Sequence, residues 1–217
     1  MGKDKVQKLP SIKRLPTYLQ ELKNLRKEGR TVVSTTLLAQ SLRLESIVVR
    51  KDLEITGVTG SPGVGYKVEE LIGCIEGFLG WDNTSDIFLV GAGALGTALL
   101  GYKGFSEYGL NIVAAFDVDP AKIGTEIHGK PVLGMDAFAN LTERMKIHMA
   151  ILCVPCEFAQ ATADLMVAAG IRAIWNFTSV TLKIPDHVVR QRVNLAGDLA
   201  VLSVALAEKL KEEQRGS

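Results

Sequence analysis

The chain has 217 residues, of which 47% are apolar and 23% are charged, and its formal net charge is +1. This length suits one or two globular domains, and the apolar content fills an ordinary core. These values exclude a wholly acidic or basic tail, and no apolar run approaches the roughly 18 residues that span a membrane.

Charge is distributed unevenly along the chain. Residues 1–60 hold 12 Lys and Arg against 6 Asp and Glu, whereas the remainder holds 13 against 18. A basic front part and an acidic rear part are expected when only one domain meets a polyanion. The three cysteines make no disulfide framework and no apolar leader opens the chain, so we expect a cytoplasmic protein.

A leucine repeat that ends at Gly29 predicts a first helix. Its members recur at spacings of three and four, which places them on one helix face. They are Leu15, Leu19, Leu22 and Leu25. Ser34 then offers a side-chain cap for a second, short helix over 35–41.

A third helix is predicted over 45–55, after a brief turn at Arg43 and Leu44. Its inward-facing residues are expected to be Ile47, Val49 and Leu53 or near neighbours. Three helices with a short turn between the second and third suit a helix-turn-helix, whose last helix enters the DNA major groove.

The next segment, 57–66, holds four glycines with alternating valine and threonine and indicates a β-hairpin. A hairpin directly after a recognition helix is typical of the wing of a winged-helix domain. A fourth helix is predicted over 68–79, and polar residues at 82–85 mark a boundary. We therefore assign residues 1–82 to a winged-helix DNA-binding domain.

The segment Val90-Gly91-Ala92-Gly93-Ala94-Leu95-Gly96 follows an apolar strand and precedes a helix predicted over 94–104. In this setting a G-x-G-x-x-G pattern predicts a dinucleotide-binding loop. Gly91 permits the tight turn, Gly93 lets a pyrophosphate approach the backbone, and Gly96 lets helix and strand pack closely. The helix N-terminus offers free N–H groups to the phosphates.

Asp117 ends the next apolar run and lies 26 positions after Gly91. A carboxylate roughly 20 residues after such a loop binds the adenosine ribose hydroxyls. Its charge repels a 2′-phosphate, which favours NAD(H) over NADP(H). The alternative is a glycine turn in some other α/β protein.

Strands and helices continue to alternate after Asp117. Strands are predicted over 130–133, 149–154 and 172–176, and helices over 135–145 and 157–169. The alternation implies right-handed βαβ units and a doubly wound parallel sheet, so residues 83–195 are assigned to a Rossmann-like dinucleotide-binding domain.

The last helix, predicted over 196–212, is apolar on every side in its first three turns. Such a helix needs burial on every side. The segment 196–217 therefore either inserts into a second subunit or packs against its own domain, and its residues alone leave both open.

Two further groups of reactive side chains were considered. Cys153-Val154-Pro155-Cys156 is a C-x-x-C whose first cysteine ends a buried strand, where a structural role is the better interpretation. A reactive Cys156 near the start of the next helix is the alternative, and the sequence leaves a redox role of the pair open. The three histidines lack metal-ligand spacing, so we predict no metal.

Taken together, the two halves resemble the Rex family of bacterial redox-sensing transcriptional repressors over nearly the whole chain. The segments that carry the resemblance are Ile12-Lys13-Arg14-Leu15-Pro16, Val49-Arg50-Lys51-Asp52-Leu53, Gly63-Val64-Gly65-Tyr66, the loop Val90 to Gly96, Ala115-Phe116-Asp117-Val118-Asp119-Pro120, Ala159-Gln160, Ala169-Gly170-Ile171 and Asn176-Phe177.

The resemblance implies a homodimer in which the last helix is swapped into the partner. Members of the family bind an inverted-repeat operator in double-stranded DNA. NADH closes the dimer and releases the DNA, whereas NAD⁺ competes for the same site and favours the DNA-bound form.

The resemblance and the motifs together predict three sets of site residues. The set for the cofactor NAD(H) is Gly91, Ala92, Gly93, Ala94, Leu95, Gly96, Asp117, Val118, Val154, Pro155 and Tyr102. The DNA-binding set is Ser34, Thr35, Ser46, Arg50, Lys51, Gly63 and Tyr66. The set that links the domains across the dimer is Arg14, Tyr102 and Asn194.

The chain departs from the family pattern at several positions. Asn194 stands where an aspartate is usual, so a pair with Arg14 loses its charge assistance. Ser61-Pro62 replaces two basic wing residues and weakens phosphate contacts. Val48 replaces a glutamine on the exposed face of the recognition helix, and Arg43 replaces the glycine of the helix-turn-helix turn.

Two other functions are weighed against a redox-sensing repressor. An NAD-dependent dehydrogenase is disfavoured because no room remains for a substrate domain and no acid–base pair is apparent, so we predict that the protein is not an enzyme. A CoA-binding or other nucleotide-binding module is disfavoured by Asp117, which suits a ribose diol, and by the basic front part of the chain.

Overall fold

The computed structural model describes residues 8–216, and these form two compact units. The first comprises the described residues up to Thr84 together with Glu107–Gly109. The second comprises Ser85–Ser106 and the described residues from Leu110 onward. Each unit has its own cluster of buried apolar side chains.

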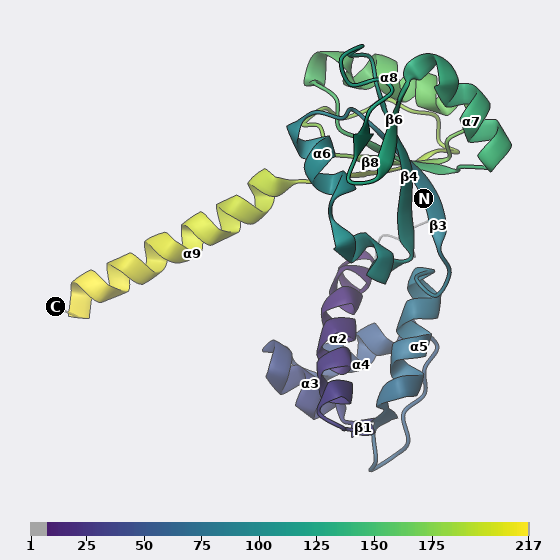
Figure 1. Cartoon of the computed structure of the whole chain (residues 1–217). Helices are drawn as coiled ribbons and strands as arrows, with labels where there is room; N and C mark the ends of the chain where they lie inside the picture. The colour runs from purple at the N-terminus through teal and green to yellow at the C-terminus, as the bar shows by residue number, and fades with distance from the viewer. Residues whose placement is uncertain (1–7, 217) are drawn as a thin grey trace. The chain divides into compact units, whose positions relative to one another are not determined.

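Helices make up most of the first unit (Figure 1). They are α2 (Leu9–Lys27), α3 (Thr35–Leu42), α4 (Ser46–Glu54) and α5 (Val68–Leu79). A small antiparallel sheet joins β1 (Val32–Val33) to β2 (Tyr66–Lys67) and ties together the chain on either side of α3 and α4. The predicted cap is confirmed, because the Ser34 hydroxyl accepts the Leu37 N–H at 3.1 Å.

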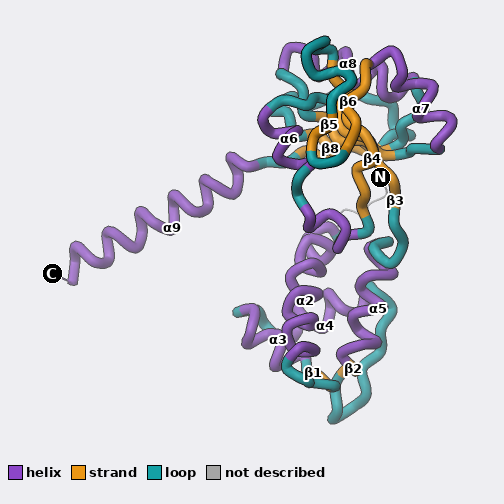
Figure 2. The backbone as a smooth tube through the Cα atoms, viewed as in Figure 1, coloured by secondary structure: helices purple, strands orange, loops and turns teal. Residues whose placement is uncertain are grey.

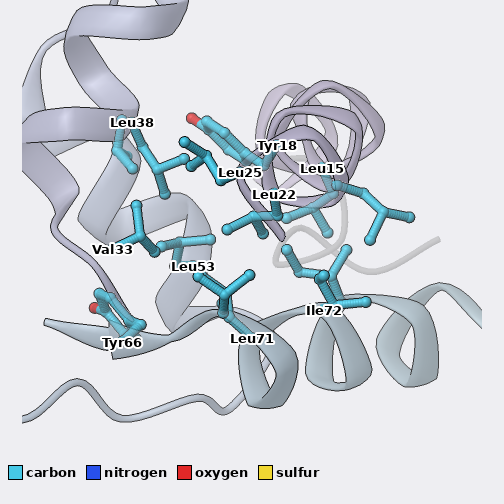
Figure 3. Close-up of a cluster of buried hydrophobic side chains, with 14 of the residues drawn as sticks. Leu15, Tyr18, Leu22, Leu25, Val33, Leu38, Leu53, Tyr66, Leu71 and Ile72 are labelled. Atoms are coloured by element: carbon cyan, nitrogen blue, oxygen red, sulfur yellow. The ribbon is translucent and has the colours of Figure 1, made fainter. Parts of the chain in front are cut away.

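The predicted leucine repeat is confirmed as the centre of the first core. All of its members are buried, and Figure 3 shows Leu15, Leu22 and Leu25 with side chains from α3, α4, α5 and both strands. The labelled residues are Leu15, Tyr18, Leu22, Leu25, Val33, Leu38, Leu53, Tyr66, Leu71 and Ile72. Removing this apolar area from water contributes about 25 cal/mol per Å² and holds the helices together.

The predicted inward face of the third helix was partly wrong. Val49 and Leu53 are fully buried, but Ile47 is 43% exposed. Two residues apart on an α-helix is a rotation of about 200°, so Ile47 and Val49 cannot face the same neighbour. The inward position next to Leu53 is taken instead by Asp52, which is 1% exposed.

The structure also refines the predicted turn and wing. Arg43 ends α3 with φ 54°, a left-handed conformation that costs a side-chain-bearing residue about 1 kcal/mol and that explains the usual glycine there. The hairpin over 57–66 is confirmed only as a tight turn with a single bridge between Ser61 and Gly65. β2 pairs with β1 rather than extending that hairpin.

A seven-stranded sheet, counted over the described residues, forms the second unit. Its strands are β3 (Ser85–Val90), β4 (Leu110–Asp117), β5 (Glu126–Ile127), β6 (Lys130–Gly134), β7 (Met149–Leu152), β8 (Ala173–Asn176) and β9 (Val189–Arg192). Their order is β5-β6-β4-β3-β7-β8-β9, and β5 alone runs antiparallel to its neighbour. The chain order reverses between β3 and β7, where doubly wound sheets open a ligand crevice.

Helices alternate with these strands, which confirms the predicted α/β class. They are α6 (Ala94–Leu100), α7 (Phe138–Met145) and α8 (Cys156–Ala168), and short 3₁₀ segments η1 (Lys103–Tyr108) and η2 (Met135–Ala137) adjoin two of them. Figure 2 shows the strands gathered among these helices. The helix predicted over 94–104 was too long, because glycine at 101 and 104 disfavours continued helix.

The last helix, α9, spans Leu195–Gly216 and starts one residue before the prediction. Its large apolar side chains are all exposed: Leu195, Leu199, Val201, Leu202, Val204, Leu206 and Leu210. Within residues 8–216, none of the helices combines the length and the apolar character that a membrane crossing needs.

An ion pair between the half-buried Arg14 and the buried Asp52 fixes α4 to α2 inside the first unit. The Arg14 guanidinium donates from Nε and Nη2 to the two carboxylate oxygens of Asp52 at 2.6 and 2.8 Å. The Tyr18 hydroxyl donates to the same carboxylate at 2.6 Å. Burial disfavours the charged form of Asp52, but the bonds from Arg14 and Tyr18 prevail and lower its pKa.

We therefore expect Asp52→Asn to lower the free energy of unfolding of the first unit by about 2–3 kcal/mol, the usual value of a charged hydrogen bond that is lost. Urea denaturation measures this change. Tyr18→Phe removes one donor only, so it is expected to lower the free energy of unfolding by less.

The stability of the first unit should also depend on pH. Because the folded pKa of Asp52 is lowered, the stabilisation by its carboxylate is present above the unfolded pKa of about 3.9 and is lost as the pH falls through the folded pKa. Equal stability of wild type and Asp52→Asn at pH 7 would contradict this role.

Candidate functional site

A cavity of about 450 Å³ opens where the carboxyl ends of β3, β4 and β7 meet. It lies at the reversal of strand order, the place where doubly wound sheets bind ligands. Its lining is Val90, Gly91, Gly93, Phe116, Asp117, Val118, Lys122, Met135, Cys153, Val154, Pro155, Phe158, Ala161, Thr162 and Leu165. The walls are mainly apolar, and Asp117 and Lys122 supply the charged groups.

The glycine loop has the geometry that its motif predicts. Gly91 has φ 100°, and a Cβ there would lie 2.5 Å from the carbonyl oxygen of Cys153. A Cβ on Gly96 would lie 2.0 Å from the carbonyl oxygen of Gly91, so only hydrogen fits. Gly93 is different, since a Cβ there would meet nothing within 4 Å. The space in front of Gly93 is therefore free for a ligand.

Asp117 ties the end of β4 to this loop. One carboxylate oxygen accepts the Ala92 N–H at 2.8 Å and the Lys122 ammonium at 3.2 Å. The other accepts the N–H groups of Val118 and Asp119 at 2.8 and 2.9 Å. Burial disfavours ionisation of Asp117, but the bonds from Asp119, Lys122 and Ala92 outweigh it and lower its pKa. The carboxylate is thus charged and rigidly oriented at neutral pH.

The cavity includes part of the set predicted to bind the cofactor. Gly91, Gly93, Asp117, Val118, Val154 and Pro155 line it. Ala92, Ala94, Leu95 and Gly96 form the loop and the first turn of α6 without lining the cavity. Tyr102 lies beyond the end of α6 and is 53% exposed, with its ring edge-on to Phe105 at a centroid distance of 4.9 Å.

A second concave surface lies in the first unit, beside the predicted recognition helix. This groove, of about 610 Å³, is lined by Ser34, Thr35, Arg50 and residues 60–66. It brings together most of the set predicted to bind DNA. Ser46 and Lys51 are exposed on α4 but are not part of its lining. Tyr66 is only 8% exposed, and its ring packs on Gly60 and supports the turn.

The residues predicted to link the domains have local partners in the chain. Arg14 is paired with Asp52, as described above. Asn194 is exposed, and its side-chain oxygen accepts the Gly197 N–H at 3.2 Å at the start of α9.

The two cysteines of the C-x-x-C differ in environment. Burial raises the pKa of Cys153 to about 12. Cys156 is exposed with its Sγ 3.1 Å from the Ser179 hydroxyl, and that contact lowers its pKa. Within residues 8–216, no three His, Cys, Asp or Glu side chains are grouped so as to hold a metal ion.

Two side chains with central contacts, Asp52 and Lys122, were not singled out from the sequence. Asp52 lies between the inward positions Val49 and Leu53, a spacing that could have signalled its burial. Lys122 follows Asp119 by one helical turn, but its contact with Asp117 depends on how the loop after β4 folds. Asp52 belongs to a segment that carries the family resemblance, whereas Lys122 stands in no motif.

Comparison with known proteins finds a matching family model for part of each half of the chain. A family described as "Putative DNA-binding protein N-terminus" matches residues 9–54, and one described as "CoA binding domain" matches residues 82–180. A "Redox-sensing transcriptional repressor Rex" of Treponema denticola is 48% identical over 96% of this chain and 100% of its own length. The chain belongs to the Rex family.

Other Rex proteins agree with this assignment. The Bacteroides fragilis repressor is 41% identical over 89% of this chain and 88% of its own length. A crystal structure of RSP with beta-NAD⁺ and operator DNA is 36% identical, with a TM-score of 0.86 over 96% of this chain and 97% of that one. RSP with beta-NADH is 34% identical, with a TM-score of 0.85 over 95% and 97% of the two chains.

Two glycines of the loop in this Rex chain have different roles: Gly96 is required by the packing of the fold, whereas Gly93 leaves space for a ligand. Gly96→Ala is expected to lower the free energy of unfolding of the second unit by about 1–3 kcal/mol, because the new methyl overlaps the Gly91 carbonyl. Gly93→Ala is the matched control, and it is expected to leave stability nearly unchanged, because that position is open and has φ −76°. Thermal or urea unfolding of both variants measures the difference, and equal losses would contradict the loop geometry.

Proposed function

We propose that this Rex protein is a transcriptional repressor that binds an inverted-repeat operator and releases it when NADH occupies the cavity at Gly91, Gly93 and Asp117. The observation that carries the proposal is the position of Asp117, a charged and oriented carboxylate beside an open glycine loop. NAD⁺ binds the same cavity and leaves the operator complex intact.

The nucleotide half of the proposal rests on chemistry at both ends of the cavity. Asp117 offers acceptors to the adenosine ribose hydroxyls and repels a 2′-phosphate. The open backbone at Gly93 receives the pyrophosphate. The apolar side chains of Val154, Pro155 and Phe158 suit the flat rings of the nucleotide. The predicted contact of Tyr102 with the cofactor is part of this proposal.

The DNA half rests on α4 and the turn that follows it. Arg50 and Lys51 are exposed cations on α4, and Ser46 is exposed at its first turn. Phosphate contacts from Ser34, Thr35 and the backbone near Gly63 position the helix, and side chains of α4 read base edges. The ion pair of Arg14 with Asp52 holds α4 at its inner face and leaves its outer face free.

The assembly we propose is a homodimer in which α9 of each chain packs against the partner. Seven large apolar side chains of α9 are exposed in the single chain, a surface that water disfavours and that a second subunit covers. Residues 1–82 then bind DNA, residues 83–195 bind the nucleotide and residues 196–217 join the subunits. The protein acts in the cytoplasm without catalysing a reaction.

Regulation requires that NADH bind one arrangement of the dimer more tightly than the other. NAD⁺ and NADH differ in the charge and shape of the nicotinamide, so the contacts that distinguish them lie near that ring. Arg14, Tyr102 and Asn194 are the residues we propose to link the nucleotide to the spacing of the recognition helices. The neutral Asn194 makes this link weaker than an arginine–aspartate pair.

The test is fluorescence anisotropy of a labelled inverted-repeat duplex with the full chain, titrated with NADH and then with NAD⁺. Specific binding that NADH abolishes and NAD⁺ spares is expected. Specific duplex binding that neither NADH nor NAD⁺ changes would refute the proposed regulation by NADH but would still support the DNA-binding function. NADH binding without any specific duplex would favour a nucleotide-binding module instead.

Two variants separate the halves of the function. Asp117→Ala is expected to weaken NADH binding at least about tenfold, because it removes both the ribose acceptor and the carboxylate that holds the glycine loop, and to leave DNA binding intact. Lys51→Ala is the converse variant. It is expected to leave NADH binding unchanged and to lower the affinity for DNA, and the slope of log affinity against log salt is expected to decrease in magnitude by about 0.9. Loss of both NADH binding and DNA binding in either variant would contradict the assignment of these two activities to separate units.

The dimer has its own test. Leu202→Glu together with Leu206→Glu places charge on the exposed apolar face of α9 and is expected to give a monomer in sedimentation equilibrium. Lys209→Glu/Lys211→Glu, which changes only charged positions of the same helix, is the matched control and should remain dimeric. A dimer in both variants would show that α9 is not the interface.

A further inference from the structure

The acceptor capacity of Asp117 is fully used in this structure. An ionised carboxylate has about four lone-pair positions. Four donors occupy them, namely the N–H groups of Ala92, Val118 and Asp119 and the ammonium of Lys122. A ribose hydroxyl that binds Asp117 must therefore replace one of these donors.

Lys122 is the donor that can leave. The three N–H groups belong to the backbone of the glycine loop and of the turn after β4, so none of them can leave without a change in backbone conformation. The Lys122 ammonium sits at the end of a flexible stem whose side chain is 36% exposed. It is also held from a second side, because Asp119 Oδ2 lies 3.6 Å from its Nζ.

This arrangement determines what the 2′ position of the ribose meets. A 2′-hydroxyl can donate to Asp117 in place of Lys122, whereas a 2′-phosphate has only acceptors to offer and needs a cation. Lys122 is the cation beside Asp117, but two carboxylates, Asp117 and Asp119, compete for it. A phosphate thus meets net negative charge and an ammonium that is already engaged.

We propose that Lys122, restrained by Asp119, sets the selectivity of the site for a nucleotide with a free 2′-hydroxyl over one with a 2′-phosphate. Asp119 acts through Lys122 and is a positioning residue. The proposal rests on the nucleotide function proposed above and adds the residues that decide which nucleotide is accepted.

Asp119→Asn is the variant that tests the restraint. Asp119 Oδ1 also accepts the Ala121 N–H at 3.0 Å, a bond that an amide oxygen keeps. The substitution therefore removes the charge that holds Lys122 and preserves the turn. We expect the ratio of the NADPH to the NADH dissociation constant to fall at least about tenfold, the gain from one charge-assisted contact with the 2′-phosphate.

Two further variants make the result specific to Lys122. Asp119→Asn/Lys122→Met is expected to lose the gain, because no ammonium remains to meet the phosphate. Asp136→Asn is the control for charge alone: this exposed carboxylate follows Gly134, the partner of Asp117 in the sheet, and no ion pair joins it to another described residue. The ratio of the NADPH to the NADH dissociation constant of Asp136→Asn is expected to match that of the wild type.

The measurement is titration of the full-length wild type and each variant with NADH and NADPH, followed by nucleotide fluorescence or calorimetry. Equal gains in Asp119→Asn and Asp136→Asn would overturn the proposal in favour of general electrostatics. Tight NADH binding with an unchanged ratio in Asp119→Asn would overturn this inference alone. Absence of NADH binding to the wild type would overturn the proposed function together with it.

Discussion

The second unit depends on the carboxylate of Asp117. By accepting the Ala92 N–H, it joins the end of β4 to the loop after β3, so the two strand ends and the turn between them become one rigid edge. The loop in turn has no room for a side chain at Gly91 or Gly96. A buried charge with a full set of donors gives this edge its geometry, and the open side of Gly93 gives it access to a ligand.

In the first unit a carboxylate with several donors fixes one helix against another. Asp52 is 1% exposed and is satisfied by Arg14 and Tyr18, which belong to α2. Apolar contacts pull α4 onto α2, but the ion pair and the hydroxyl fix its rotation, since their geometry tolerates little displacement. The inner face of α4 is thereby engaged, and its outer cations stay exposed: Lys51, and Arg50, whose Nε lies 3.7 Å from Glu54 Oε1 in a surface ion pair.

In the proposed repressor the two units carry different kinds of recognition, and α9 provides the contact between subunits. Its apolar side chains have no cover in the single chain. The chain belongs to the Rex family, and the similar protein RSP has been solved with beta-NADH and with beta-NAD⁺ and operator DNA, which supports the proposal that one chain carries both surfaces. A switch of this kind needs two recognition helices whose spacing the nucleotide can change, and therefore a second copy of the chain.

The sequence by itself determined the features that depend on local periodicity and turn chemistry. The leucine spacing of α2, the Ser34 cap, the glycine loop and the alternation of strands with helices could all be read because each is specified by neighbouring residues. Tertiary structure alone decided the burial of Asp52 in place of Ile47, the pairing of the polar edge strand β9, and the contact of Lys122 with Asp117. The Arg14 partner of Asp52 lies 38 residues away in the chain, and β9 pairs with a strand in a separate segment, so no local pattern encodes these contacts. Lys122 lies only five residues from Asp117, but their contact depends on how the turn after β4 folds.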